Sequence, residues 1–334
     1  MRYRFGDPFG GNAGDYMVDI RKPRKGSMAV RPRKRAKRHV KRVNAWPDST
    51  EKSVLGFAGY KAGMTTVSWV ESRQGPRKGM EVFGGATIIE APPMAVYGVR
   101  VLANGSNYDE FSDDNDVMKP LGAKKKPKSS IKEGIEAEAY DVRLLAYAQP
   151  ASTSTGKKHI ERMELGVGGA NTEEKLTYGR ELLGKQLSVA DVIKTGSFVD
   201  VVAVTKGKGW QGPVKRFGVS TQRRKATGKV RHVGTLGPFK PGYVQYTAPM
   251  PGQMGYHKRT EINKLVLGVF TKEKAEDINP KSGWPYYGVV KNDFIVLKGS
   301  IPGPVKRVVR LRHSIRKRET VEPKLSFIDN SSKN

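Results

Sequence analysis

Cysteine is missing from the chain, which excludes disulfides, thiolate chemistry and cysteine-based zinc sites. Long apolar runs are also missing. The longest, such as 198–204, have the length of a strand, whereas a membrane helix needs about 20 apolar residues. The first 20 residues contain no apolar stretch of the kind found in a secretory signal. We therefore expect no membrane partner and a cytoplasmic location.

Acidic residues are missing from three long windows, although the chain has 32 of them and 61 basic residues. Windows 21–42, 201–260 and 294–318 hold 12, 12 and 8 Lys or Arg and no Asp or Glu. The rest of the chain is close to neutral. A merely solvated surface normally mixes both signs, so the windows indicate segments that meet a polyanion. Nucleic acid is the expected polyanion because no segment suits a lipid bilayer.

Residues 1–53 are predicted to be a basic extension that becomes ordered on RNA. The run 21–47 has few large apolar residues, no periodicity, and prolines at 23, 32 and 47. A nuclear-targeting signal is the alternative for such a run, but it leaves the other two windows unexplained.

Strand-like segments follow from residue 53 onward, with β-branched and aromatic residues between Gly and Pro turns. Segments 53–60 and 65–72 are expected to be two strands joined by a turn at 61–64. Further strands are expected at 81–91, 94–103, 135–148, 197–205, 262–270, 286–298 and 305–311. Short helices are expected at 172–183 and 188–194, with Thr172 and Ser188 as N-caps. This pattern predicts a mainly β fold with minor α, built as a closed or nearly closed β-barrel.

The expected domain organisation follows from these shifts in composition. The barrel body is predicted over 54–205, with a polar loop at 104–134, and again over 261–318, whose last strands are basic. A basic finger over 206–260 is inserted between two barrel strands, and 319–334 is a polar tail.

A Gly-x-Gly-x-x-Gly run at 207–212 resembles a dinucleotide-binding motif. Pro213 follows it closely, and no acidic residue occurs until Glu261 to hold a ribose. The glycines are better interpreted as allowing close backbone approach. The five histidines show no metal-ligand spacing, and no local nucleophile–base pair is visible. We therefore predict no catalytic residues, no metal and no cofactor.

Basic residues in 206–259 alternate with glycines and aromatics, including Trp210, Phe239 and Tyr256. Arg and Lys bind phosphates, and aromatic rings stack on unpaired bases. A small local core is the alternative for each ring.

Five ordered segments carry a resemblance to a known family: PRKGSMAVRPRKRAKRH, GFAGYKAGMT, VTKGKGWQGPVKRFG, MPGQMGYHKRTEIN and VLKGSIPGPVKRVVRLR. The chain from about residue 21 resembles the universal family of large-subunit ribosomal protein three, in its archaeal and eukaryotic type. Residues 1–20 extend beyond the pattern.

The resemblance implies a non-enzymatic protein that binds large-subunit ribosomal RNA early in assembly, beside neighbouring large-subunit proteins and without a small-molecule substrate. Its finger would approach the peptidyl transferase centre and the path of incoming aminoacyl-tRNA. The finger tip is expected at Arg231, His232, Gly237, Pro238 and Phe239, and Phe239 stands where relatives often have Trp. The expected RNA-binding residues are Arg21, Lys22, Arg24, Lys25, Arg31, Arg33, Lys34, Arg35, Lys37, Arg38, His39, Lys41, Arg42, Lys61, Lys206, Lys208, Trp210, Lys215, Arg216, Arg223, Arg224, Lys225, Lys229, Arg231, His232, Phe239, Lys240, Gln253, Tyr256, His257, Lys258, Arg259, Lys306, Arg307, Arg310 and Arg312.

Two other functions compete with this one. An RNA-modifying enzyme would need a cofactor motif or a catalytic carboxylate near the basic groove, and the acid-free window of 60 residues argues against it. A transient nucleic-acid chaperone or translation factor would wash off ribosomes in high salt.

Overall fold

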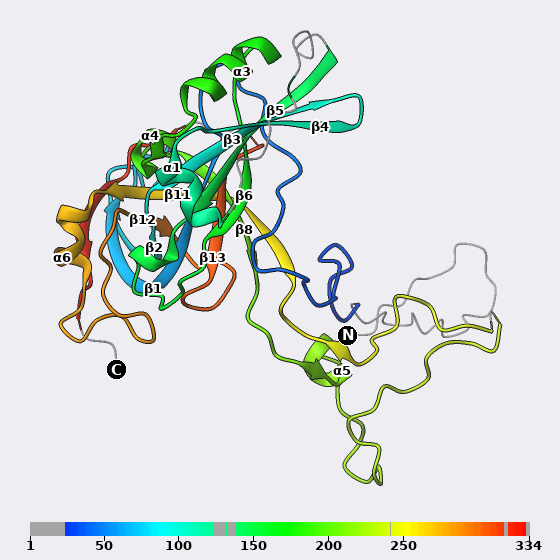
Figure 1. Cartoon of the computed structure of the whole chain (residues 1–334). Helices are drawn as coiled ribbons and strands as arrows, with labels where there is room; N and C mark the ends of the chain where they lie inside the picture. Colours follow the sequence, from blue (N-terminus) through cyan, green and yellow to red (C-terminus); the bar gives the residue numbers. More distant parts are fainter. Residues whose placement is uncertain (1–23, 123–130, 132–137, 241, 317–319, 332–334) are drawn as a thin grey trace, which may run out of the picture. The chain divides into compact units, whose positions relative to one another are not determined.

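The computed structural model describes residues 24–122, 131, 138–240, 242–316 and 320–331, and it divides into two compact units. The larger unit comprises 34–208 and 255–334, and the smaller one comprises 1–33 and 209–254. The fold is mainly β with minor helix, as predicted. Figure 1 labels most of the helices and strands.

Seven strands of the larger unit form one antiparallel sheet in the order β13-β8-β11-β12-β2-β1-β14. Strand β1 also pairs with β13, so the sheet comes nearly full circle into a ring. The strands are β1 (Gly56–Val70), β2 (Glu81–Glu90), β8 (Phe198–Val204), β11 (Lys258–Phe270), β12 (Phe294–Lys298), β13 (Val308–His313) and β14 (Lys324–Ile328).

A second sheet of the larger unit has the order β4-β3-β5-β6, and β7 pairs with β3. Its strands are β3 (Met94–Ala103), β4 (Ser106–Phe111), β5 (Ala139–Ala148), β6 (Glu161–Gly166) and β7 (Gln186–Leu187). Helix α3 (Thr172–Glu181) covers this sheet: its Leu176 is buried, and a methyl group added at Gly179 would lie 3.2 Å from Val99 Cγ1.

The helices are short throughout the described chain. Besides α3 they are α1 (Asn115–Met118), α4 (Val189–Val192), α5 (Pro213–Phe217), α6 (Ala275–Ile278), and the 3₁₀ turns η1 (Lys119–Leu121), η2 (Pro150–Ser152) and η3 (Lys272–Lys274). In the smaller unit, α5 stands beside a two-stranded ladder of β9 (Trp210–Gln211) and β10 (Gly252–Gln253).

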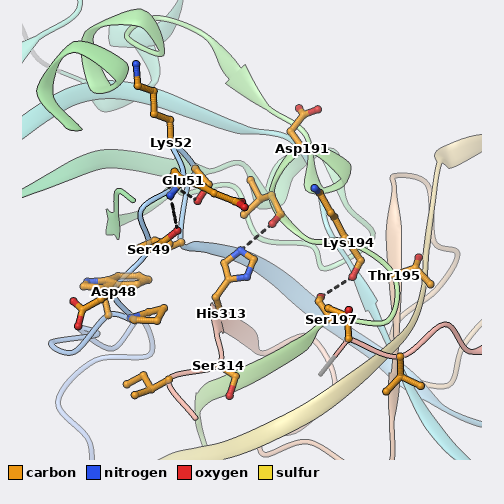
Figure 2. A pocket seen from close by; sticks show the side chains of 18 of the residues that line it. Asp48, Ser49, Glu51, Lys52, Asp191, Lys194, Thr195, Ser197, His313 and Ser314 are labelled. Carbon is orange, nitrogen blue, oxygen red and sulfur yellow. Dashed lines mark hydrogen bonds between the residues drawn. The ribbon is translucent and has the colours of Figure 1, made fainter. Parts of the chain in front are cut away.

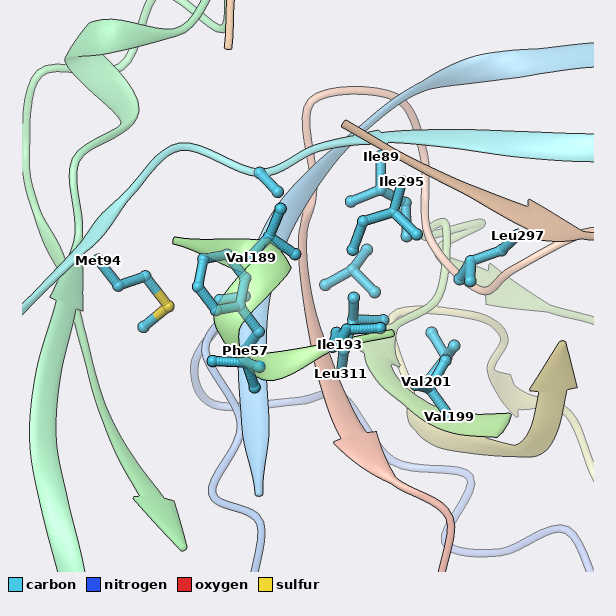
Figure 3. Close-up of a cluster of buried hydrophobic side chains, with 14 of the residues drawn as sticks. Phe57, Ile89, Met94, Val189, Ile193, Val199, Val201, Ile295, Leu297 and Leu311 are labelled. Carbon is cyan, nitrogen blue, oxygen red and sulfur yellow. The ribbon is translucent and has the colours of Figure 1, made fainter. Parts of the chain in front are cut away.

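The hydrophobic core fills the ring and continues toward α4. Leu311 on β13 pairs with Phe57 on β1 and with Val201 on β8, and all three side chains are almost fully buried. Paired residues of neighbouring strands point to the same face of a sheet, so these side chains meet in the core. Figure 3 shows these side chains with Val189 and Ile193, which lie on and just after α4.

The predicted turn at 61–64 was wrong, because β1 is one continuous strand with a bulge between Lys61 and Gly63. Gly63 serves close packing instead: an added Cβ would lie 2.4 Å from the Trp284 ring. Lys61 points inward and donates to the carbonyls of Ile301 and Gly303 at 2.9 and 3.3 Å.

The polar loop prediction for 104–134 was wrong at its start. Asn104 and Gly105 both have positive φ and form a tight hairpin turn, from which β4 returns along β3. Residues 115–121 then form α1 and η1, and most of 123–134 lies outside the described residues. The polar tail at 319–334 contains strand β14, and β6 and β7 were not predicted.

Helix caps were predicted with mixed success. Ser188 is the N-cap of α4 and forms a capping box with Asp191, as predicted. Thr172 instead is the first residue of α3, whose N-cap is Asn171. Of the expected strand 286–298, only Phe294–Lys298 is a strand.

Candidate nucleic-acid interface

Most of the expected RNA-binding side chains are exposed, and two of them, Arg21 and Lys22, lie outside the described residues. The exposed residues are Arg24, Lys25, Arg31, Lys34, Arg35, Lys37, Arg38, His39, Arg42, Lys206, Lys208, Trp210, Lys215, Arg223, Arg224, Lys225, Lys229, Arg231, His232, Phe239, Lys240, Lys258 and Lys306. The half-buried residues are Arg33, Lys41, Arg216, Gln253, Tyr256, Arg259 and Arg307.

Segment 34–46 has no helix or strand, yet its backbone is tied to the larger unit. Some of its carbonyl oxygens accept hydrogen bonds from basic side chains in residues 257–310 of the same unit. Lys258 Nζ donates to Arg42 O at 2.9 Å, and Arg310 donates to Lys41 O at 2.7 Å. The ring of His257 lies 3.0 Å from Lys34 O. Several carbonyls of the segment therefore have partners within the protein, while most of its basic side chains remain in solvent.

The far end of this segment is held by packing. Val43 is buried, and the ring of Trp46 lies over Gly56 and Gly166, where an added Cβ would be 2.8 and 2.6 Å from its atoms. The glycines are needed there because any larger residue would push the indole away. The guanidinium of Arg310 lies 5.9 Å from the Trp46 ring centroid.

Four of the expected RNA-binding residues are buried: Lys61, His257, Arg310 and Arg312. Arg312 donates to Asp200 Oδ2 and to Ala45 O, both at 2.6 Å. Burial lowers the pKa of Arg310 to about 10, and its guanidinium still carries its charge at neutral pH. Their partners lie inside the protein: Lys61 binds within the larger unit, whereas His257, Arg310 and Arg312 bind the backbone of segment 34–46.

A strained turn at Gly255 and Tyr256 completes this part of the larger unit. Both residues have positive φ, and a Cβ on Gly255 would lie 2.1 Å from Lys206 O. The Tyr256 ring lies under the guanidiniums of Arg35 and Arg307, at 5.9 and 5.2 Å from its centroid. Its hydroxyl lies 3.1 Å from His39 Nδ1. Burial and the Arg307 charge lower the pKa of His39, so its ring is neutral at pH 7.

In the smaller unit, Arg216 on α5 organises the backbone around it. It donates to Gln253 O at 3.1 Å, to Met250 O at 2.8 Å and to Arg33 O at 3.4 Å. Phe217 lies between two guanidiniums, since Arg33 and Arg216 are 4.2 and 5.1 Å from its centroid. These arginines therefore have internal roles as well as charge.

The Gly-x-Gly-x-x-Gly run leads into β9 and α5. Pro213 occupies the first turn of α5, so a helix does open there, but it has only five residues. No acidic residue follows before Glu261. This leaves no helix or carboxylate suited to a dinucleotide.

Aromatic rings of the smaller unit are exposed to an unusual degree. Phe239 is 93% exposed, Tyr246 78%, Trp210 75% and Tyr243 71%. A local core, the alternative interpretation for each ring, does not form around these four. The guanidinium of Arg31 lies 5.2 Å from the Tyr246 ring centroid.

An ion network that sequence reasoning missed joins the second sheet to segment 34–46. Glu164 on β6 pairs with Arg100 at 2.8 Å, with Arg143 at 3.1 Å and with Arg42 at 3.3 Å. Arg100 also pairs with both oxygens of Asp109, at 2.6 and 2.7 Å. The signal available in the sequence was the presence of both signs of charge along β5 and β6 and of Arg100 within the otherwise uncharged β3, but the pairing of these strands could not be read from it.

Elsewhere, the described chain holds a cavity of about 760 Å³ beside segment 46–55, shown in Figure 2. Its lining mixes acidic residues such as Glu51 and Asp191 with Lys52 and Lys194. His313 Nε2 lies 2.9 Å from Val192 O, so this ring forms a hydrogen bond with another residue that lines the cavity. The described residues contain no group of three metal-ligating side chains, and none of their helices has the length and apolarity to cross a membrane.

Fold and surfaces together define a β-sheet protein whose extended segments display unpaired cations. Within residues 24–41 and 209–240 of the described chain, no Lys or Arg forms an ion pair with a carboxylate.

The family model described as Ribosomal protein L3 matches residues 17–108 and 107–334. The chain is 41% identical over 333 residues to the large ribosomal subunit protein uL3 of Methanobrevibacter smithii, an alignment covering 95% of this chain and 99% of that one. The same protein of Methanocaldococcus jannaschii is 42% identical, with 95% and 98% covered, and that of Archaeoglobus fulgidus 44%, with 88% and 92% covered. The chain belongs to the ribosomal protein L3 family, a structural, non-enzymatic component of the ribosome.

Proposed function

We propose that this chain is a structural constituent of the large ribosomal subunit, and that it binds and organises large-subunit ribosomal RNA early in assembly. The observation that carries the proposal is the row of mostly exposed basic side chains on segment 34–46, in which several backbone carbonyls accept hydrogen bonds from the larger unit. Because these carbonyls have partners within the protein, the backbone is held in place while the exposed basic side chains stay available to phosphates. Neighbouring large-subunit proteins are its other partners, and its place is the cytoplasmic ribosome.

The nearly closed ring of strands acts as the barrel body in this proposal, with 1–53 as the extension and 206–260 as the finger. Residues 231–239 form the finger tip, which approaches the peptidyl transferase centre and the entry path of aminoacyl-tRNA. The exposure of Phe239 and of the other aromatic rings in 209–254 supports contact with unpaired bases. The exposed and half-buried cations named above remain the proposed contacts.

Co-sedimentation with ribosomal subunits in rising salt tests the proposal. A subunit constituent stays with large subunits through a high-salt wash, whereas a transient chaperone or translation factor is released. Sequencing the RNA recovered with the washed chain should return large-subunit ribosomal RNA. Release of the chain at moderate salt, or recovery of unrelated RNA, would contradict the proposal.

A further inference from the structure

Residues 279–293 form a loop that belongs to none of the three acid-free windows, and that was expected to be partly a strand. Its two legs are joined by the Asn279 side chain: Val290 N donates to Asn279 Oδ1 at 2.9 Å, and Asn279 Nδ2 donates to Val290 O at 3.0 Å. Nearer the tip, Trp284 and Gly288 exchange backbone hydrogen bonds of 2.8 and 3.0 Å. The loop is therefore a closed, doubly bridged structure.

A buried carboxylate fixes the returning leg. Glu90 on β2 has no exposed surface, and its Oε1 accepts hydrogen bonds from Lys291 N at 2.9 Å and from Asn292 N at 3.0 Å. Its Oε2 accepts from the Tyr287 hydroxyl. Burial and the Glu90 charge raise the pKa of Tyr287, so this phenol keeps its proton and remains a donor. Such a network holds one backbone geometry.

Tyr286 stands at the tip of this rigid loop and is 89% exposed. Its φ is +62°, a left-handed conformation that is costly for an aromatic residue and natural for glycine. A ring held in this conformation without any contact of its own costs stability and contributes nothing to the fold. Strain of this kind persists where the displayed side chain has a use.

Positive charge flanks the ring on both legs. Lys281 and Lys291 are exposed, and neither forms an ion pair in the described chain. The one carboxylate of the loop is occupied: Asp293 accepts from Lys272 N at 3.0 Å and from Ser188 Oγ at 3.3 Å. An exposed aromatic ring with an exposed lysine five residues before it and another five residues after it suits an unpaired base with its phosphates.

We infer that Tyr286 is an RNA-binding residue that stacks on an unpaired nucleotide of ribosomal RNA, with Lys281 and Lys291 on the adjoining phosphates. This inference rests on the proposed function and adds a contact outside the basic segments 1–53 and 206–260. Glu90 is a positioning residue that holds the loop through the backbone of Lys291 and Asn292 and through the Tyr287 hydroxyl.

The test is ultraviolet cross-linking of intact large subunits that contain the full chain, followed by mass spectrometry of peptide–nucleotide adducts. Trypsin cuts after Lys281 and Lys291, so Tyr286 lies on a separate peptide of residues 282–291. The expected result is a nucleotide adduct on Tyr286. Tyr286→Phe should keep the adduct, because it keeps the ring. Tyr286→Gly should abolish it while raising the melting temperature of the free protein, because glycine relieves the positive φ.

Tyr140→Ala is the matched control, since Tyr140 is 63% exposed on the body but belongs to β5, outside this loop. It should leave the Tyr286 adduct unchanged. An unmodified 282–291 peptide, in subunits where peptides of 24–42 do carry adducts, would overturn the inference and leave the proposed function intact. Absence of the chain from large subunits would instead overturn the proposed function.

Discussion

Segments 34–46 and 219–249 carry six Lys or Arg each and no acidic residue, yet the protein supports them in different ways. The backbone of 34–46 is bound at Lys34, Lys41, Arg42 and Ala45 by side chains of the body. The backbone hydrogen bonds among the described residues of 219–249 form local turns, such as the one from Gln222 N to Val230 O at 2.8 Å. Composition alone predicted the same behaviour for both, namely order only on RNA.

The difference shows that a basic segment can be ordered by basic side chains of the same protein, which bind its backbone carbonyls, and not only by the phosphates of RNA. Arginine and lysine side chains of the body bind the carbonyls of 34–46, so charge repulsion between basic groups is offset by charge-assisted hydrogen bonds to the backbone. We therefore revise the expectation for 34–46, and expect it to be ordered in the free protein. Among the described residues of 219–249 the backbone hydrogen bonds are local, so we expect the order of this segment to depend on RNA.

Deleting 219–249 and closing the gap with a short Gly-Ser linker should have the largest effect. Six charges disappear, so the slope of log affinity against log salt should become shallower by about 4–5 for ribosomal RNA. Unfolding of the body by guanidinium should change by no more than about 0.5 kcal/mol. Ribosomes with the shortened chain should translate poorly. Replacing only the six basic residues by Gln is the matched control and should reproduce the change in slope; an unchanged slope would show that the segment binds no phosphates.

Arg312→Leu should have the next largest effect, and it acts on the anchored segment. Asp200 is 1% exposed and would be left buried without its partner, at a cost of about 3–5 kcal/mol in the free energy of unfolding. Hydrogen exchange near Ala45 should rise as well. Arg231→Leu, the same change at an exposed site, should shift stability by no more than about 0.5 kcal/mol. Equal unfolding midpoints for the two variants would contradict the view that segment 34–46 is anchored to the protein while segment 219–249 is not.

The sequence predicted the strands well where alternation and β-branched residues set the pattern, as at 94–103 and 197–205. The prediction failed where a glycine could either form a turn or make room for a neighbouring side chain. Gly63 indicated a turn, but the missing side chain makes room for Trp284 within a continuous strand. Sequence also could not separate exposed cations from buried ones, because Arg310 and Lys306 stand in the same basic run, yet Arg310 is buried within β13 and Lys306 is exposed in the turn before it.

Tertiary partners explain the remaining failures. The role of Glu90 depends on Tyr287 and Asn292, about 200 positions away, and no local pattern announces such a contact. For the same reason the exposed Tyr286 was placed in a strand and not recognised as a candidate contact.

Phe239→Ala probes the loosely held segment at its most exposed ring. The side chain buries nothing in the protein, so the free energy of unfolding should not change. If the ring stacks on a base, the variant should lose about 1–3 kcal/mol of local RNA contact. Large subunits should still incorporate the chain, while tRNA accommodation or sensitivity to inhibitors of peptide-bond formation changes. Phe239→Trp should retain both properties, and a wild-type response of the Ala variant would exclude stacking.

Acidification should have the smallest effect, and it acts through His39 on the anchored segment. Burial and the charges of Arg307, Lys157 and Lys41 lower the pKa of His39, and Glu161 opposes them only in part. A His whose pKa is lower in the folded state favours the fold while neutral. Its contribution is therefore full above the ordinary value of 6.5 and is lost as the pH falls through the lowered value. Protonation should loosen the bond to the Tyr256 hydroxyl, because the new charge lies among other cations. Hydrogen-exchange protection near residue 39, expressed relative to residues 219–240 to cancel intrinsic rates, should decline as pH falls below 6.5. His39→Asn should flatten that decline; a decline of the same size in the variant would assign it to other groups.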